Sequence, residues 1–446
     1  MDMLHGSLFD KILLFALPLA AGSMLQQMFN AVDVAVIGRF ASSRALAAVG
    51  SNSAVVMLFV TLFVGTSAGT SVVIANYIGE GRKDRISAAV HTSMFLALVG
   101  GLGLMASVLL LAHPILMLMA IPEEVLPLSI IYLRVYSLGM PGIMVYNFGA
   151  AVLRSVGDSR RPVRCLILSG VINAVLNVIF VVAFGWGVAG VALATSIANT
   201  ISAGLVVYFL MTEETDIRFD PKKLRLHRYE AGRILMIGVP TGLQGTVFSV
   251  ANVCVQTAVN GYGAAAIAGC SICQNFEGIC FYSINGFAQA ATTFAGQNFG
   301  ARNMKRCLRV LLLCMGAGVA ACMFMNVLIV SAGHPIAGLF TKDPEVIKYA
   351  VERMRYILLF QWLACSYEIT GACMRGFGDS LSPTILTVFG TCLLRIIWIL
   401  TVDRKFHIFR LLLIVYPVSW ILTGILVITA FTVLYRRLAR RYAASA

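Results

Sequence analysis

The amino-acid sequence predicts an all-α polytopic membrane protein with twelve transmembrane helices in two parallel six-helix repeats. Composition is the first observation, since the chain is 59% hydrophobic and only 12% charged, about half the charge of soluble domains. Long uncharged stretches are the second, with 21 residues enclosed by Lys11 and Asp33 and 48 by Arg164 and Glu213. A span of the hydrocarbon core needs about 20 apolar residues. An internal repeat is the third observation.

The apolar segments predict the individual spans in chain order. Spans of more than thirty residues must tilt or bend to fit the bilayer. The predicted transmembrane helices are 12–38, 46–78, 88–112, 126–152, 163–184, 188–211, 234–259, 264–298, 308–332, 349–374, 383–402 and 409–435.

The repeat has an offset of 221 residues. "LRSVGDSRRP" at 153–162 returns as "MRGFGDSLSP" at 374–383, and "ANYIGEGRKDR" at 75–85 aligns with "GQNFGARNMKR" at 296–306. Each half holds six predicted spans, so both halves begin on the same side and are related by a pseudo-two-fold axis along the membrane normal. We expect a six-helix bundle over 1–211, a basic cytoplasmic linker over 212–233, and a second bundle with a basic cytoplasmic tail over 234–446.

The net charge of +14 indicates orientation rather than a nucleic-acid partner. With the amino terminus inside, the inner segments hold 23 of the 34 Lys and Arg residues, as the positive-inside rule requires. The sequence therefore predicts a multi-pass protein of the cell inner (plasma) membrane with both termini cytoplasmic. It contains no Walker A motif, no metal-ligand spacing and no cluster of nucleophiles. We expect no enzymatic activity, no metal and no cofactor.

The repeated "R-x-x-G-D-S-x-x-P" motif follows the fourth span of each half. Its residues are Arg154, Gly157 and Asp158 in the first half and Arg375, Gly378 and Asp379 in the second. Two interpretations stay open. The glycines and aspartates could form a tight turn and a helix cap, or Arg154 and Asp158 could pair as an inner latch when the cytoplasmic side is closed.

Asp33 is the most informative single position, because charged residues within spans usually mark ion or proton paths. Asn173 and Asn177 share one helical face, as do Thr195 and Asn199. Other candidates fall in two groups. Possible cavity residues are Gln26, two turns before Asp33, and Asn199 and Glu277. Met24 and Met28, whose side chains repack easily, belong to the same group. The charged candidates in the second half are Glu277, Glu368 and Arg395, and we expect Glu368 and Arg395 to form a buried charge pair, although Arg395 could instead pair with Glu277.

Three motifs, in this order and spacing, carry a family resemblance. They are "VD-x-x-x-IGR" at 32–39, "LR-x-x-GD" after the fourth span, and "FAGQNFGA" at 294–301. With "GWGVAGVALAT" at 185–195 and "LLRIIWI" at 393–399, the chain resembles multidrug and toxic compound extrusion (MATE) transporters, in particular their DinF-like branch.

The resemblance implies a MATE-like fold and a monomeric secondary active exporter in the lipid bilayer, which antiports small amphipathic molecules, often organic cations, against H⁺ or Na⁺. It also implies that Asp33 couples transport to the ion together with Asn173, Asn177 and Thr195, and that Gln26 and Asn147 line a cavity. Many relatives carry Asp where this chain has Asn177, which makes proton coupling through Asp33 the simpler option. A lipid-linked saccharide flippase is the alternative function. Such flippases typically have fourteen spans and a cationic cavity.

Overall fold

The computed structural model describes residues 1–119 and 121–443, which form helices and connecting loops without a β-strand in these ranges. Eleven helices in this part of the chain are long and apolar enough to cross a membrane, and a pair bent by 42° can be counted as a twelfth, broken span. The bent pair joins Leu126–Ser137 and Met140–Ser155, which together cover the fourth predicted span. The predicted all-α class and the count of twelve are confirmed.

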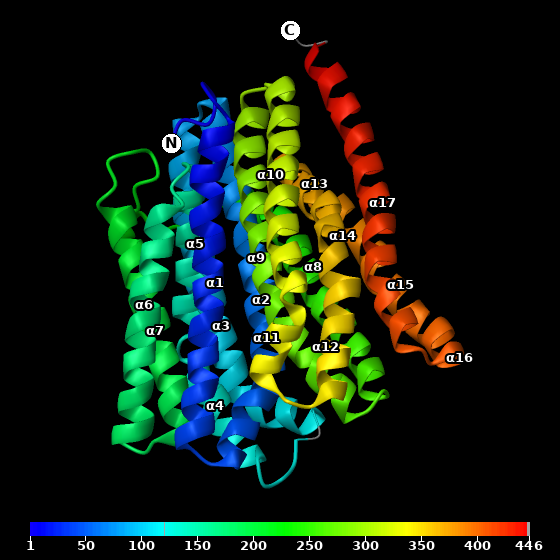
Figure 1. Ribbon diagram of the computed structural model, residues 1–446. Helices are drawn as coiled ribbons and strands as arrows, with labels where there is room; N and C mark the ends of the chain where they lie inside the picture. The colour runs from blue at the N-terminus through cyan, green and yellow to red at the C-terminus, as the bar shows by residue number, and fades with distance from the viewer. Residues whose placement is uncertain (120, 444–446) are drawn as a thin grey trace. The chain divides into compact units, whose positions relative to one another are not determined.

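The chain divides into two compact units. Unit 1 consists of Met1 and Gly22–Gly242, and unit 2 of Asp2–Ala21 and the chain from Leu243 onward. Two helices contribute to both units, namely α1 (Phe9–Phe40) and α8 (Arg228–Asn260). The other α-helices of unit 1, labelled in Figure 1, are α2 (Ser43–Glu80), α3 (Lys83–Leu118), α4 (Leu126–Ser137), α5 (Met140–Ser155), α6 (Arg160–Val178) and α7 (Gly187–Met211). Unit 1 also contains the short segments η1 (Ile179–Ala183) and η2 (Pro221–Lys223).

Unit 2 contains the remaining helices. They are α9 (Ala264–Gly300), α10 (Met304–Ser331), α11 (Gly333–Phe340), α12 (Pro344–Ile357), η3 (Leu358–Leu363), α13 (Ala364–Gly376), α14 (Leu381–Thr387), η4 (Val388–Leu393), α15 (Leu394–Trp398), η5 (Ile399–Asp403), α16 (Arg404–Phe406) and α17 (Phe409–Ala443).

Several spans change their helical pitch along their length. The fourth span breaks between α4 and α5, and the tenth contains the 3₁₀ segment η3 between α12 and α13. The fifth span ends in the π segment η1, whereas the eleventh contains two, η4 and η5. With the repeat offset of 221 residues, η1 of the first half corresponds closely to η5 of the second half. η4 is therefore an additional irregularity of the second half.

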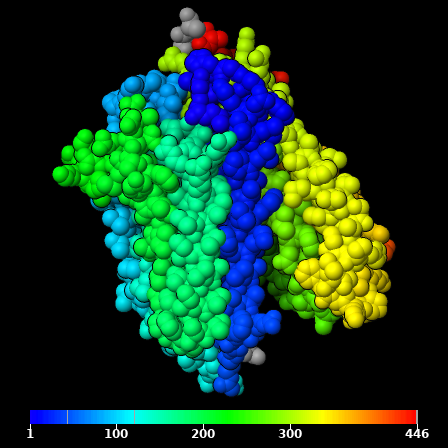
Figure 2. All heavy atoms as spheres, turned by 60° about the vertical axis from the view of Figure 1, so that its left-hand side comes forward, coloured from blue at the N-terminus to red at the C-terminus, as the bar shows by residue number. Residues whose placement is uncertain are grey.

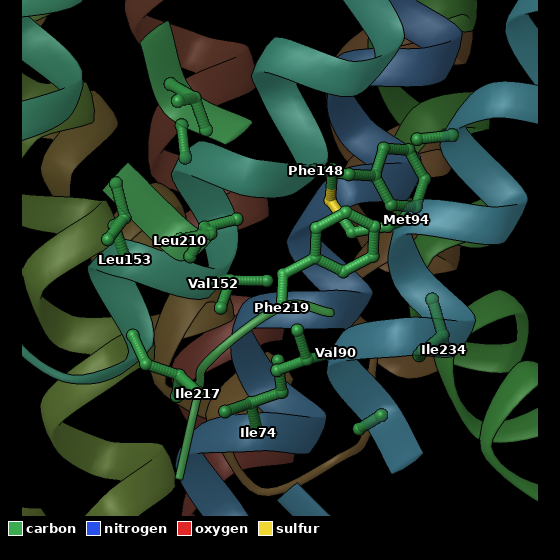
Figure 3. Packing of buried hydrophobic residues seen from close by; sticks show 14 of the residues in the cluster. Ile74, Val90, Met94, Phe148, Val152, Leu153, Leu210, Ile217, Phe219 and Ile234 are labelled. Carbon is green, nitrogen blue, oxygen red and sulfur yellow. The ribbon is translucent and has the colours of Figure 1, made fainter. Parts of the chain in front are cut away.

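The segment between α7 and α8, which we expected to be a linker, packs into the core of unit 1. Figure 3 shows Ile217 and Phe219 of this segment among apolar side chains that include Val90 and Phe148. The backbone N–H of Asp220 also donates to His91 Nε2 at 3.1 Å. In the space-filling view this segment (green) lies against the ends of α6 and α7 (teal) (Figure 2). The boundaries of unit 1 therefore differ from the expected 1–211.

Glycine pairs bring α2 and α8 into direct backbone contact within unit 1. A Cβ atom added to Gly65 would lie 2.3 Å from Gly242 Cα, and one added to Gly238 would lie 2.2 Å from Thr66 O. Small residues four apart allow this close approach of membrane helices. The contact places the first half of α8 in unit 1. Gly286, the repeat equivalent of Gly65, packs in the same way on the first half of α1 in unit 2, where an added Cβ atom would lie 2.8 Å from Ala16 O.

Candidate functional site

Asp33 belongs to a hydrogen-bonded network of side chains from α1, α6 and α7 that includes both Asn177 and Thr195. Asn177 Nδ2 donates both to Asp33 Oδ1 and to Asn173 Oδ1, the latter at 3.1 Å. Asn173 Nδ2 in turn donates to Thr195 Oγ1 at 3.2 Å. Asp33 is half-buried, and both asparagines are buried. The structure thus brings all four sequence-predicted residues together, with a carboxylate whose partners are neutral.

Helical spacing explains why this network forms. Asn173 and Asn177 are separated by four residues and therefore project from one face of α6. The hydroxyl of Thr195 donates to the Val191 carbonyl of its own helix at 3.0 Å, which fixes its rotamer and directs its lone pairs toward α6. Amide and hydroxyl groups supply both donors and oxygen acceptors. The network can therefore hold a proton on Asp33 or offer oxygen ligands to a hard cation.

Two tyrosines near Asp33 were missed by the sequence reasoning. Tyr132 and Tyr136 on α4 stack with their ring centroids 5.8 Å apart, and both hydroxyls lie within electrostatic range of the Asp33 carboxylate. Both side chains are buried. Their spacing of four residues within the predicted span 126–152 is the signal that would have placed them on a common helical face.

The remaining predicted cavity residues stand apart from this hydrogen-bonded chain. On α1, Met28 is 63% exposed and Gln26 is exposed, while Met24 is half-buried. Asn147 donates its amide to the Ile143 carbonyl of α5 at 2.8 Å. Asn199 on α7 is half-buried. Their role as substrate-cavity residues stays a prediction.

The repeated turn motif has the same geometry in both halves. Gly157 and Gly378 adopt φ values of 83° and 90°, a region that glycine enters without strain. Asp158 Oδ1 accepts from the backbone N–H groups of Arg160 and Arg161 at 3.0 and 3.1 Å.

The motif's charged groups are paired differently from the predicted latch. In the second half, Asp379 Oδ1 accepts from Ser382 N at 3.0 Å. Asp158 forms its ion pair with Arg161, at 2.6 Å, and not with Arg154. In this conformation the motif therefore serves as a turn and a cap.

The charged residues of unit 2 are also paired differently from the prediction. Glu277 on α9 binds Arg353 on α12 through two hydrogen bonds, at 2.6 and 3.0 Å. The expected pair between Glu368 and Arg395 is absent, because Arg395 instead binds neutral partners. The cation that acts on Glu368 electrostatically is Arg375. The sequence contained Arg353 within the predicted span 349–374, but nothing in it specified which acid lay opposite.

The described residues contain no group of three or more His, Cys, Asp or Glu side chains that could hold a metal ion. Ten of the eleven cysteines are buried in the helices, where they act as small apolar side chains.

Comparisons with known proteins agree with this architecture. The sequence model of the MatE family matches residues 18–179 and 240–400, one block in each half of the repeat. The "Probable multidrug resistance protein YpnP" of Bacillus subtilis is 27% identical over 88% of each chain. The "Probable multidrug resistance protein NorM" of Thermotoga maritima is 29% identical, over 84% of this chain and 82% of its own.

Solved structures share the fold. A crystal structure of MATE in the straight conformation has a TM-score of 0.92 at 23% identity and covers 98% of both chains. An outward-facing multidrug resistance MATE family transporter has a TM-score of 0.91 with the same coverage. At this identity the likeness shows the fold alone. Together with the family match over most of both halves, it shows that the chain belongs to the MatE family of membrane transporters, which are not enzymes.

Proposed function

We propose that the protein is a secondary active multidrug exporter that antiports small amphipathic molecules against H⁺ through Asp33, with Na⁺ as the alternative coupling ion. The observation that carries the proposal is the half-buried Asp33 carboxylate, joined to Asn177, Asn173 and Thr195 by hydrogen bonds. The relatives named as multidrug resistance proteins support the substrate class. The proposal includes a monomer in the cell inner membrane with both termini in the cytoplasm.

Proton coupling is favoured because the site contains one carboxylate. A single carboxylate among neutral side chains can release its proton on one side of the membrane and take it up on the other. Alternating access needs only a difference in proton affinity between the two conformations. A Na⁺ ion would be held by Asp33 and by neutral oxygens of the same residues, with only one negative charge to neutralise it.

Proteoliposomes with imposed gradients test this assignment. We expect a pH gradient to drive efflux of a cationic dye in the native protein and to fail in Asp33→Asn, since the amide keeps the shape and hydrogen bonds but cannot titrate. Asp10→Asn is the matched control, because Asp10 is an exposed aspartate at the start of the same helix. A Na⁺ gradient imposed separately distinguishes the two ions.

The counter-hypothesis places coupling in the second half. Glu277→Gln and Glu368→Gln are measured under the same pH gradient. Normal proton-driven efflux by Asp33→Asn would refute the assignment. Loss of efflux in Glu277→Gln alone would move the coupling site to unit 2, provided that this variant keeps the native midpoint of thermal unfolding, because Glu277 also pairs with Arg353.

A further inference from the structure

Unit 2 contains a buried guanidinium that no acid neutralises. Arg395 on α15 is 1% exposed. Its Nη1 donates to Asn252 Oδ1 at 3.0 Å and its Nε to Ser419 Oγ at 3.4 Å. Among the residues that the structure describes, no carboxylate forms an ion pair with it. A charge inside a span is costly, and such residues commonly mark a ligand pathway.

The other charged groups of the spans in unit 2 have partners of their own. Both carboxylate oxygens of Glu277 accept hydrogen bonds from Arg353, one from Nε and one from Nη2. Asp403 accepts a hydrogen bond from the Tyr262 hydroxyl. Glu368, in the tenth span, lies within electrostatic range of Arg375.

Aromatic rings hold the guanidinium in place without neutralising it. Its central carbon lies 4.4 Å from the centroid of the Tyr416 ring and 5.2 Å from that of Phe248. Cation–π contacts of this kind use the face of the guanidinium, so the N–H donors along its edge that do not bind Asn252 and Ser419 can bind a planar oxyanion. Asn252, which binds the same group, is exposed, so one member of the cluster lies at the surface.

The repeat gives this cluster a counterpart in the first half. Tyr416 is the repeat equivalent of Thr195 in the Asp33 network, because the two positions differ by the offset of 221 residues. The Asp33 network uses α1, α6 and α7, and the Arg395 cluster uses the equivalent spans, represented by α8, α15 and α17. One half therefore places a carboxylate among amides and a hydroxyl. The other half places a guanidinium among an amide, a hydroxyl and aromatic rings.

The extra π segment belongs to the same region. η4 (Val388–Leu393) ends immediately before the short helix that carries Arg395, and α6 has no such segment at the equivalent position. π segments rotate the following residues and are frequent at functional sites.

We propose that Arg395, Asn252, Ser419 and Tyr416 form a binding site for the carboxylate of an amphipathic substrate. The guanidinium supplies charge and paired donors, and the aromatic rings supply apolar contact. The inference rests on the proposed export function and names the side chains of unit 2 that bind a carboxylate group of the substrate.

Two xanthene dyes of opposite charge test the site. Fluorescein carries a free carboxylate, whereas rhodamine 6G carries an esterified carboxyl group and a positive charge on the same ring system. Binding is measured by fluorescence anisotropy on the purified full-length protein in detergent. We expect Arg395→Gln to weaken fluorescein binding at least about tenfold, as for the loss of a charged hydrogen bond, and to leave rhodamine 6G binding unchanged. Arg404→Gln, which removes an exposed cation from the same span, should change neither.

Fluorescein binding by Arg395→Gln equal to that of the native protein would overturn the proposal. If that variant fails to fold, competition on the native protein still tests the proposal. Benzoate should displace fluorescein, whereas its neutral analogue benzamide should not. Equal displacement by both compounds would also overturn it. Asp33-dependent efflux of rhodamine 6G is measured separately, so failure of the carboxylate site and failure of the export function give different results.

Discussion

Ionisable side chains inside the spans are stabilised in different ways. Asp33 accepts a hydrogen bond from a neutral amide, and Glu277 and Arg353 form a two-point ion pair in which Arg353 is 2% exposed. Removing one partner of a buried pair leaves an uncompensated charge, whereas removing both can be nearly neutral. We therefore expect that replacing one member of the Glu277–Arg353 pair lowers stability more than replacing both.

Removal of one partner of this pair should destabilise the protein strongly. We expect Arg353→Met to cost about 3–5 kcal/mol and the double variant Glu277→Gln with Arg353→Met to cost clearly less, as judged by thermal unfolding in detergent. Arg355→Met is the control, because Arg355 lies on the same helix and is exposed. A double variant as unstable as Arg353→Met would show that the pair does not explain the loss.

At the scale of the elements, close helix packing depends on a few glycines. α2 and α8 approach so closely that the added Cβ at Gly238 would meet the Thr66 carbonyl at 2.2 Å. Backbone atoms cannot move aside as a flexible side chain can. The added methyl group would therefore force the two helices apart and disturb the core of unit 1.

A single methyl group tests this crossing. Gly238→Ala should lower the midpoint of thermal unfolding, at a cost of about 1–3 kcal/mol for overpacking. Gly232→Ala on the same helix has no atom within 4 Å of the added Cβ. It should be neutral or stabilising, because alanine favours helix. Equal effects of the two substitutions would contradict the proposed role of the crossing.

One substitution in the turn motif distinguishes its two interpretations, the helix cap and the latch. Asparagine caps helices as well as aspartate does, so Asp158→Asn should keep both stability and turnover if the residue only caps α6. Asp158→Ala should cost about 1 kcal/mol, measured by thermal unfolding. Loss of turnover in a stable Asp158→Asn would instead favour the latch, in which the negative charge is required in another conformation.

At the scale of the whole molecule, the distribution of Lys and Arg predicts the orientation of the chain. The basic residues cluster after even-numbered spans, which the positive-inside rule assigns to the cytoplasm. The same rule places both termini there. Because ten of the eleven native cysteines are buried, introduced cysteines can report the topology with little background.

Cysteines at three exposed positions test the orientation. A membrane-impermeant maleimide applied to intact cells should label Lys342→Cys, and it should reach Lys222→Cys and Asn303→Cys only after the membrane is opened. All three positions are exposed in the structure. Labelling of position 342 only from the cytoplasm would show that the orientation is the reverse of the predicted one.

Properties that depend on the local sequence could be predicted well. The number of spans follows from hydropathy, because an apolar segment of sufficient length needs no particular partner to enter a bilayer. The turn at Gly157 and Gly378 follows from residue type. The Asp33 network was also within reach, since Asn173 and Asn177 share a helical face and the family motif identified their partner.

Pairing between distant helices was decided only by the tertiary structure. The sequence offered Arg395 two acids, yet it binds neither, and Glu277 binds Arg353. Hydropathy likewise indicated a linker over 212–233, but Phe219 packs in the core of unit 1. A sequence pattern determines which face of a helix is apolar or polar. The rotation and crossing of each helix against its neighbours determine which charge lies opposite, and those depend on close packing over the whole unit.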